Sequence, residues 1–473
     1  MAKQKQTNHT LDFKKDRLLQ IATVVFILML GAFVYNKILP WQIEAVIIVT
    51  AAVGVLLIGF NRLPKSLQIT GIVVMLIGTL GLFYSQSALN RAFRQIDVER
   101  SIVSFVVLEE SEIQDLENGE DYRYGLSGLL DLELKELSLT TVNEEFGFMM
   151  VYDEFDYDST VYTALLNDQI DVMVVDNALV GLFEDEYPDF WDEVRVIYEV
   201  SKEYERDQIR TDTDLKKDPF VVYISGIDVQ GPLTNRSRSD VNILMYVNPD
   251  KGEILQVSLP RDLYIPIACQ NNRKDKLTHS GNYGIGCSID TIENYMGHEI
   301  DLFARVNFTS FINIINVIGD IQVHSHYSFT TRGGKHTFSA GTNTMNAEQA
   351  LAFSRERYNV PGGDVTRGLH QQEVIKGVIN KLVSPSTIVR IEGIIREVAS
   401  SVDTNATSDD LLAIVNRQIS GNIKWEFTSM AMKGTDSMLP GVQNPNQLVY
   451  YMQPREDVYN EIQAEIKRVM NKE

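Results

Sequence analysis

Cysteine is scarce in this sequence of 473 residues, which contains only two, Cys269 and Cys287. So few cysteines exclude a small domain that is held together by several disulfides. No Cys-x-x-Cys or His-Glu-x-x-His spacing occurs, so the sequence gives no support to a zinc site. The chemistry of this protein therefore has to come from other residue types.

Positive charge is also in short supply. The chain has 43 Lys and Arg against 64 Asp and Glu, which gives a net charge of −21. A protein that binds nucleic acid needs a basic surface for the phosphate backbone, so the composition argues against a nucleic-acid partner. A small phosphate site is still compatible with this balance, because such a site depends on local charge. The length allows two or three domains.

Three long apolar runs occupy the first part of the chain, at residues 18–35, 43–60 and 67–84. Each run has about 18 residues and hardly a charge, which is close to the length of a membrane-spanning helix. No small-residue cleavage site follows the first run, which disfavours a cleaved signal peptide. We therefore predict a cytoplasmic tail at residues 1–17 and three transmembrane helices within residues 18–85.

Basic residues in the tail, and Arg62 and Lys65 in the second loop, set the predicted orientation. Cytoplasmic loops carry the excess of Lys and Arg, so an odd number of spans leaves the remainder outside. We predict a multi-pass protein of the cell membrane with a cytoplasmic N-terminus and extracellular C-terminal domains. In that compartment we expect a disulfide between Cys269 and Cys287, with free thiols as the alternative.

Residues 97–215 are markedly acidic and form the predicted accessory domain. Strand-like runs at 101–108, 146–152 and 170–176, with a helical pattern before the last, indicate a small α/β domain. The last helix and strand resemble a step of periplasmic-binding-protein-like domains. Two roles stay open, a sensor of a ligand or glycan and a spacer or oligomerisation domain.

From residue 219 the pattern becomes strand, loop, strand, turn, strand. Ligands of α/β sheets bind beyond the strand ends, so charged side chains at those ends are candidates for a site. Six such side chains occur here, namely Asp228, Arg236, Arg238, Asp240, Arg261 and Asp262.

A second group of polar side chains lies at residues 352–372, around a Pro-Gly-Gly turn. Two arginines two residues apart share a face if the backbone is a strand. After the turn, Asp364 begins a helical pattern in which an arginine and a glutamine four residues apart share a face. Arg binds phosphate oxygens with two N–H donors, so the pattern predicts a phosphate or pyrophosphate site, with carboxylate pairing as the alternative. The side chains concerned are Arg355, Arg357, Arg367 and Gln371.

The order of these motifs resembles the LytR-CpsA-Psr family. The motifs are GID at 226–228, RSD at 238–240, SLPRD at 258–262, AEQALAFSRER at 347–357 and TRGLHQQ at 366–372. Within the family, the three spans and the acidic domain resemble the streptococcal capsule-biosynthesis proteins of the CpsA type. One difference is Val241-Asn242 after Asp240, where many relatives have Thr and an aliphatic residue. The resemblance covers residues 219–383, implies an α-β-α layered catalytic domain with a central mixed sheet, and leaves 384–473 as an extension packing on it.

The resemblance implies a phosphotransferase that moves capsular polysaccharide from a polyprenyl-pyrophosphate carrier to peptidoglycan. Asp228 and Asp240 would hold Mg²⁺, with Mn²⁺ as an alternative, and both are implied to be catalytic. The pyrophosphate would be held by Arg238, Arg261, Arg355, Arg357, Arg367 and Gln371, of which Arg261, Arg355, Arg357 and Arg367 are also implied to be catalytic. The lipid tail would lie in an apolar pocket between the sheet and the helices, lined in part by Phe311, Ile314, Ile315 and Ile318.

Two other functions remain open at this point. The protein could be a non-enzymatic regulator or scaffold of capsule synthesis that contacts other assembly proteins. It could also be a phosphatase that uses water on the lipid pyrophosphate, which would need the same residues. The general base is not assigned, because a carboxylate that binds Mg²⁺ is a poorer base. Asp262 and Asp364 are expected to orient arginines or cap a helix.

Overall fold

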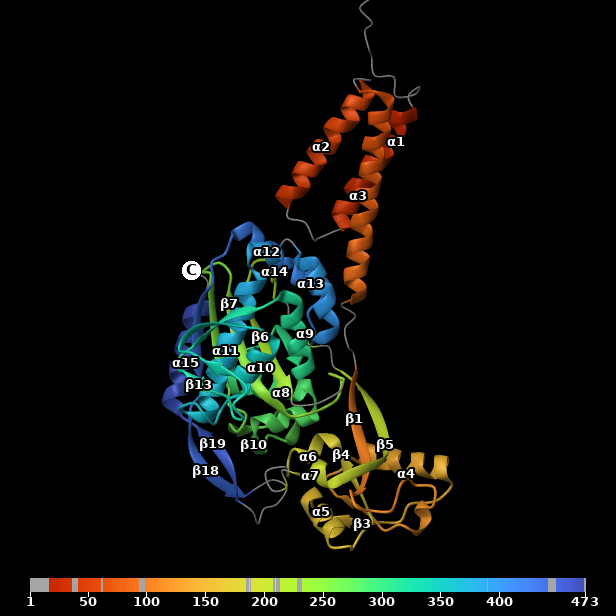
Figure 1. Ribbon diagram of the computed structural model, residues 1–473, viewed down its shortest axis with the longest axis vertical. Helices are drawn as coiled ribbons and strands as arrows, with labels where there is room; N and C mark the ends of the chain where they lie inside the picture. Colours follow the sequence, from red (N-terminus) through yellow and green to blue (C-terminus); the bar gives the residue numbers. More distant parts are fainter. Residues whose placement is uncertain are drawn as a thin grey trace, which may run out of the picture.

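The structure of the protein is a computed structural model that describes residues 17–35, 41–60, 63–92, 98–183, 187, 189–206, 209, 213–227, 232–388, 390–440 and 448–471. Figure 1 shows three parts in chain order. A helical N-terminal part leads into a small α/β accessory domain, and a larger α/β domain follows.

The N-terminal part consists of the helices α1 (Arg17–Tyr35), α2 (Trp41–Gly59) and α3 (Lys65–Ala92), and α1 packs against the other two. Two segments are long and apolar enough to cross a membrane, Arg17–Val34 and Lys65–Tyr84. The corresponding apolar part of α2 is shorter. Among the described residues, two candidate spans therefore stand where three were predicted, and the middle span stays a prediction.

The accessory domain has a five-stranded sheet in the order β3-β2-β4-β1-β5. β2 is parallel to both β3 and β4, whereas β1 runs antiparallel to β4 and β5. Connections through helices follow each parallel strand, which is the expected arrangement for parallel pairing. The elements are β1 (Val98–Leu108), β2 (Tyr124–Ser127), α4 (Leu132–Phe146), β3 (Tyr152–Phe155), α5 (Asp158–Leu166), β4 (Val172–Asp176), α6 (Asn177–Val180), α7 (Phe190–Glu193) and β5 (Val194–Glu205).

The strand predicted at 146–152 was wrong in its position. Phe146 is the last residue of α4, and Gly147 ends that helix in the left-handed region at φ 79°. Phe148 and Met150 then pack into the domain core without joining the sheet, and β3 begins only at Tyr152. The apolar residues of this run were thus correctly assigned to the core, but they fill it from a loop.

The larger domain is built on a six-stranded mixed sheet in the order β16-β11-β6-β7-β8-β17. The antiparallel strands β6, β7 and β8 form its centre, flanked by parallel pairing of β11 with β6 and of β17 with β8. The strands are β6 (Phe220–Ile227), β7 (Ser239–Asn248), β8 (Glu253–Ser258), β11 (Leu302–Val306), β16 (Asp403–Thr404) and β17 (Glu426–Ala431).

The two faces of this sheet bury alternate residues of its strands. Val221, Tyr223 and Leu244 face one core, which also holds residues of α8 (Ile285–Met296) and α15 (Glu456–Met470). Their neighbours Phe220 and Ile243 face the other side, toward α11 (Gly363–Leu382) and α14 (Ser408–Gly421). Alternation with a period of two is what a strand buried on both faces requires. The result is the predicted α-β-α layering (Figure 1).

The last part of the chain belongs to this sheet. Residues 384–473 were predicted to pack on the catalytic domain as an extension, and the segment supplies β16 and β17, the two edge strands.

The two cysteines of the chain, Cys269 and Cys287, form a disulfide with their Cα atoms 5.6 Å apart. This bond ties a short 3-10 turn at Ala268–Gln270 to the first turn of α8.

Candidate active site

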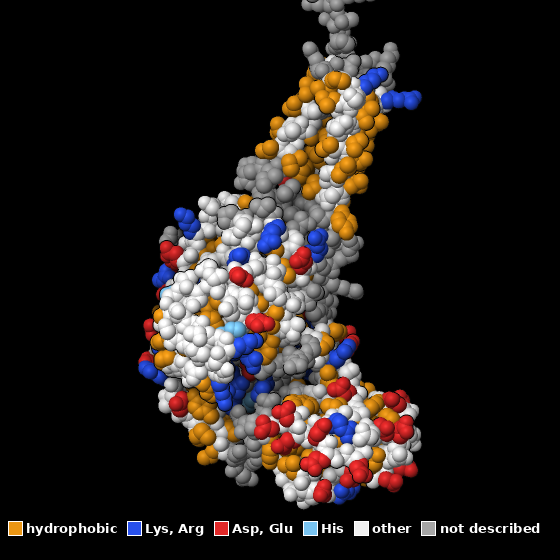
Figure 2. All heavy atoms as spheres, in the orientation of Figure 1, with side chains coloured by type: hydrophobic (Ala, Val, Ile, Leu, Met, Phe, Trp, Pro, Cys, Tyr) orange, Lys and Arg blue, Asp and Glu red, His pale blue; other side chains and the backbone are white. Residues whose placement is uncertain are grey.

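A cavity of about 410 Å³ lies on the α11 face of the sheet, where β6 ends and β7 begins. Figure 2 shows Lys and Arg side chains gathered on the surface of this domain near α10 (Ala347–Arg355), beside an accessory domain covered with Asp and Glu. The cavity lining includes six of the predicted site residues, namely Asp240, Arg261, Arg355, Arg357, Arg367 and Gln371. Tertiary structure thus brings together residues more than a hundred positions apart.

Two predicted site residues are not in this lining. Asp228 falls outside the described residues. Arg238 immediately precedes β7, and its Nη1 lies 3.5 Å from the carbonyl oxygen of Gly181 in the accessory domain. The predicted metal and pyrophosphate roles of these two side chains stay predictions.

Both carboxylate oxygens of Asp240 have a partner in the site. Its Oδ2 lies 3.0 Å from Nη1 of Arg261, and its Oδ1 accepts a hydrogen bond of 2.9 Å from Oγ1 of Thr278. Burial alone would raise the pKa of this carboxyl, but the charges of Arg261, Arg238 and Arg367 and the Thr278 hydrogen bond hold it below its usual range. The carboxylate is therefore ionised and fixed in one orientation.

Carboxylates also flank the arginines on their outer sides. Asp262 Oδ2 lies 3.7 Å from Nε of Arg261, and its Oδ1 lies 3.4 Å from Nζ of Lys276. Asp364 pairs with Arg367 at 2.6 Å. Burial raises the pKa of Asp364, an effect that Arg367 only partly offsets. The structure thus assigns Asp262 and Asp364 to orienting arginines, one of the two roles expected for them.

The glycine turn sets the start of α11. Gly362 and Gly363 have φ of 82° and 56°, in the left-handed region that favours glycine. The helix that follows has Arg367 and Gln371 one turn apart, and both line the cavity as their spacing predicted. The next residue of the helix, Gln372, is fully buried and donates to the backbone carbonyls of β8 and β17. Gln372 thereby fixes how α11 lies on the sheet.

Arg355 and Arg357 reach the cavity by a route that differs from the prediction. Arg355 is the last residue of α10 rather than part of a strand, and extended backbone begins at Glu356. Glu356 is buried and accepts hydrogen bonds from the backbone N–H groups of Arg332, Tyr358 and Asn359. The carboxylate holds the loop, so the arginines on either side of it are exposed and line the cavity.

Aromatic rings support these two exposed guanidinium groups. Arg355 lies 4.2 Å from the ring centroid of Phe308, the first residue of α9 (Phe308–Ile318). Arg357 donates a hydrogen bond of 2.7 Å to the hydroxyl of Tyr358. Stacking on Phe308 restricts Arg355 without using the N–H donors that would bind phosphate oxygens, whereas Arg357 uses one donor on Tyr358 and keeps the others.

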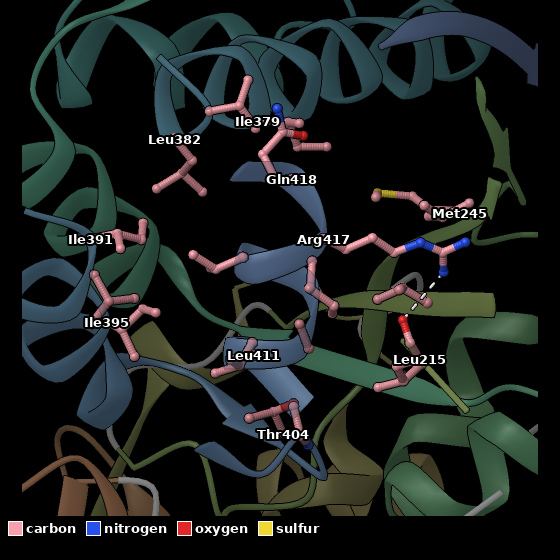
Figure 3. Close-up of a pocket in the computed structure, with 18 of the residues that line it drawn as sticks. Leu215, Met245, Ile379, Leu382, Ile391, Ile395, Thr404, Leu411, Arg417 and Gln418 are labelled. Carbon is pink, nitrogen blue, oxygen red and sulfur yellow. Dashed lines mark hydrogen bonds between the residues drawn. The ribbon is translucent and has the colours of Figure 1, made fainter. Parts of the chain in front are cut away.

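A second cavity, of about 390 Å³ and lined almost entirely by apolar side chains, continues along the same face of the sheet (Figure 3). Five elements contribute to both cavities, among them β11, with Val306 in the polar cavity and Ala304 in the apolar one. In β6, Ile224 lines the polar cavity and Val222 lines the apolar one. In α11, Ile375 lines the polar cavity and Ile379 the apolar one. The same division occurs in β7 between Val241 and Met245, and in α9 between Phe311 and Ile314. Neighbouring positions of each element thus line first the polar cavity and then the apolar one.

The helix predicted to line a lipid pocket divides between two environments. Phe311 lines the polar cavity, and Ile314 and Ile318 line the apolar one. Ile315 is 1% exposed and packs in a separate core beneath the helix. The apolar cavity is also lined by α13 (Ile391–Val398), which contacts α3.

Several residues of the site were missed by sequence reasoning. Thr278 lies in a 3-10 segment, and no local pattern marks it as a partner of a carboxylate 38 positions away. Glu356 and Tyr358 stand inside or beside the SRER motif, so their position could have drawn attention to them. Phe308 precedes the apolar helix positions that were singled out.

A metal ion would have limited protein ligands here. Within the described residues, no group of three or more His, Cys, Asp or Glu side chains converges. Mg²⁺ is commonly bound through one or two carboxylates together with substrate phosphates and water, and the ionised Asp240 can supply one of these. The described residues therefore fit a metal that is shared with a phosphate ligand.

Comparison with known proteins gives a consistent result. The sequence profile of the LytR_cpsA_psr family matches residues 194–468. TagU of Bacillus subtilis, a polyisoprenyl-teichoic acid–peptidoglycan teichoic acid transferase, is 34% identical over 258 residues, which cover 54% of this chain and 80% of TagU. TagU of Enterococcus faecalis is 29% identical over 304 residues, 63% of this chain and 95% of the relative. Matches among solved structures include B. subtilis TagU, at 32% identity and a TM-score of 0.43 over 54% of this chain and 99% of that one.

The family profile covers more than half of the chain, and the identity to B. subtilis TagU extends over most of that protein's length. The matched part contains every candidate site residue named above and begins in β5 of the accessory domain. The chain belongs to the LytR-CpsA-Psr family.

Proposed function

We propose that this protein is a membrane-anchored phosphotransferase that moves capsular polysaccharide from a polyprenyl-pyrophosphate carrier to peptidoglycan. Its relatives are teichoic acid–peptidoglycan transferases, which supports a glycopolymer as donor and peptidoglycan as acceptor. The assignment of capsular polysaccharide, rather than teichoic acid, rests on the order of predicted spans, acidic accessory domain and catalytic domain, which resembles that of capsule-biosynthesis proteins.

The observation that carries the proposal is the succession of the two cavities. The first has four arginines in its lining, and the second is apolar throughout most of its wall. A polyprenyl pyrophosphate has the same succession of a doubly charged head and a hydrocarbon tail. Arginine forks neutralise phosphate oxygens, and burial of each CH₂ group of the tail contributes about 0.8 kcal/mol.

The reaction follows from this placement. A hydroxyl of a peptidoglycan sugar attacks the phosphorus that carries the glycan, and a new P–O bond forms. The bond from that phosphorus to the bridging oxygen breaks, polyprenyl phosphate leaves with the electron pair, and the hydroxyl proton is released. Arg261, Arg355 and Arg357 neutralise charge on the phosphate oxygens as it develops, which is the main requirement of phosphoryl transfer.

A divalent cation is part of the proposal. When bound, Mg²⁺ or Mn²⁺ would supply charge neutralisation between the carboxylate and the pyrophosphate. Asp240 is the described residue suited to hold it, since its carboxyl is ionised and lines the cavity. Asp228 is proposed as the second ligand on the family resemblance alone.

The position of the apolar cavity suits a lipid substrate that arrives from the outer leaflet. α13 lines that cavity and contacts α3, the long N-terminal helix with a candidate span at Lys65–Tyr84. In Figure 1 the α12, α13 and α14 end of the catalytic domain lies nearest the N-terminal helices. We propose a multi-pass anchor with both extracellular domains outside the cell, so that the mouth of the cavity lies close to the bilayer.

The test uses the full-length protein in lipid nanodiscs with Mg²⁺, polyprenyl-pyrophosphate-linked capsule glycan and purified peptidoglycan. We expect phosphate-linked glycan on the peptidoglycan, and a loss of about 100-fold or more for Arg261→Ala. The matched control is Arg455→Ala, which removes an exposed arginine paired with Asp457 on the far C-terminal helix. Equal rates for wild type and Arg261→Ala would contradict the proposal.

The same assay separates the alternatives. Release of a soluble glycan phosphate without attachment to peptidoglycan would identify a lipid-pyrophosphate phosphatase. Absence of both products, with binding of the lipid unaffected by Arg261→Ala, would favour a regulator or scaffold. Replacement of the capsule donor by a teichoic-acid donor reports the polymer, because a higher rate with teichoic acid would overturn the capsule assignment.

A further inference from the structure

The loop between β6 and β7 is bound to the accessory domain through its backbone. The N–H of Arg100 in β1 donates to the carbonyl of Thr234 at 2.8 Å, and the N–H of Arg236 donates to the carbonyl of Arg100 at 2.9 Å. These bonds form a parallel bridge between Arg100 and Asn235. The loop therefore pairs with β1 at Arg100, before the residues Val103–Val106 that pair with β4, and it leads directly to Arg238 and Asp240.

A buried cluster of charges lies beneath this bridge, with Glu99 at its centre. Glu99 is 5% exposed, and its Oε1 lies 3.2 Å from Arg305 and 3.7 Å from Arg206. The same oxygen accepts a hydrogen bond of 2.9 Å from the N–H of Ile285, the first residue of α8. Its Oε2 lies 3.5 Å from Nε of Arg236 in the loop.

Further contacts connect this cluster to the loop and the catalytic sheet. Arg305, which is 1% exposed, donates a hydrogen bond of 2.8 Å to the carbonyl oxygen of Asn235. Arg206 forms two hydrogen bonds of 2.8 Å with the carboxylate of Asp403 in β16. Removing one partner from such a buried group of charges is costly, because the others are left uncompensated. The cluster therefore fixes the loop relative to both domains.

A second contact reaches Arg238 itself. The carbonyl of Gly181, at the end of α6, lies 3.5 Å from Nη1 of Arg238. A Cβ atom at Gly181 would come within 2.4 Å of Cδ of Arg238. Gly181 has φ −56°, a value that any residue can adopt. A larger residue is therefore disfavoured here only because Arg238 occupies the space that its Cβ would need. The side chain of Arg238 thus lies against the accessory domain.

We propose that the accessory domain is a positioning element of the pyrophosphate site, which holds Arg238 and the loop before Asp240 through Glu99 and Gly181. This inference rests on the proposed function, since it takes Arg238 as a contact of the pyrophosphate. Glu99 and Gly181 precede residue 194, where the family profile begins, whereas Arg206, Arg236 and Arg305 lie within it. The accessory domain is thus required for phosphate binding rather than being a separable spacer.

Gly181→Ala is the sharpest test, because alanine fits the backbone at this position and only the stem of Arg238 has to move. The probe is geranyl pyrophosphate with Mg²⁺, and its dissociation constant is measured by calorimetry on the full-length protein in nanodiscs. We expect Gly181→Ala to weaken binding about tenfold with an unchanged melting temperature. In an Arg238→Ala background, Gly181→Ala should weaken binding no further.

The matched control is Gly128→Ala in the same domain, where a Cβ would meet no atom closer than 3.5 Å. Wild-type affinity in Gly181→Ala, or equal weakening of the Arg238→Ala background, would overturn the inference. Failure of the proposed function looks different, because wild type would then bind no probe or Arg261→Ala would bind as tightly as wild type.

A second variant tests the charged cluster. Glu99→Gln keeps the shape of the side chain and an acceptor for Ile285, but it removes the charge that the arginines face. We expect faster amide exchange at residues 233–238, weaker probe binding, and unchanged exchange in β7 and β8. Unchanged exchange in the loop would overturn the role of Glu99, as would faster exchange throughout the sheet, which marks a general loss of stability.

Discussion

Oδ2 of Asp240 and Nη1 of Arg261 form an ion pair of 3.0 Å in the lining of the polar cavity. Because the second carboxylate oxygen accepts from Thr278, both oxygens of Asp240 are held before any ligand binds. A phosphate or metal that enters the site meets a carboxylate that needs no reorientation.

Thr278→Val should weaken this arrangement while keeping the size of the side chain. Loss of a hydrogen bond to a charged group costs about 1.5–3 kcal/mol, so we expect transfer activity to fall about tenfold or more. The pKa of Asp240 should rise, because the hydrogen bond is one of the causes that lower it. The acid limb of the pH–rate profile would then move to higher pH. Thr337→Val, on an exposed hairpin, is the control. Coincident pH–rate profiles for Thr278→Val and wild type would contradict the role of Thr278 in holding Asp240.

Ile379→Trp should shorten the apolar cavity without touching the arginines. Ile379 lines that cavity one turn of α11 beyond Ile375, which lines the polar one. We expect KM to rise for long polyprenyl donors and to stay unchanged for a donor with a ten-carbon chain, since only the longer tail reaches the obstruction. Asn380→Trp, exposed on the same helix, serves as control. A uniform effect on both chain lengths would argue against a tail in this cavity.

His370 should make the catalytic domain sensitive to acid. Its ring is fully buried, stacked on Phe353 at 4.1 Å and on Phe329 at 5.3 Å, and burial lowers its pKa to about 4. The unfolded chain binds a proton near pH 6.5 and the folded one does not, so stability falls as the pH drops from about 6.5 to about 4, by about 3 kcal/mol.

Urea unfolding at pH 7.5 and pH 4.5 measures this loss, which His370→Phe should largely remove. His324→Phe, on the exposed face of β12 (Ile321–Ser325), should leave it in place. An identical pH dependence of the free energy of unfolding in wild type and His370→Phe would contradict the assignment.

Cys269 and Cys287 should resist maleimide in the native and the denatured protein until a reductant is added. Reduction should cost about 3 kcal/mol of stability, because a loop of this length gains freedom in the unfolded chain. The mass shift before and after reduction measures the state of the thiols. Labelling of both cysteines without reductant, in protein taken from intact cells, would also count against an extracellular location.

Local periodicity predicted one part of the cavity lining and some of the strands. The spacing of Arg367 and Gln371 predicted one helix face, and both line the cavity. The strand beginning at Phe220 and the strand ending at Asp176 were recognisable from their apolar runs. Phe146 was misassigned because a short apolar run has the same pattern in a strand and at the end of a helix that packs into a core.

The sequence by itself determined which chemistry is available. The arginines, the carboxylates and the long apolar runs were enough to predict a phosphate site, a membrane anchor and layered sheets, because side-chain type and period are local properties. Tertiary structure alone decided which groups meet. Thr278 reaches Asp240, Gly181 reaches Arg238, and Glu99 joins Arg305 from 206 positions away, because the folded sheets set these distances and no periodicity records them.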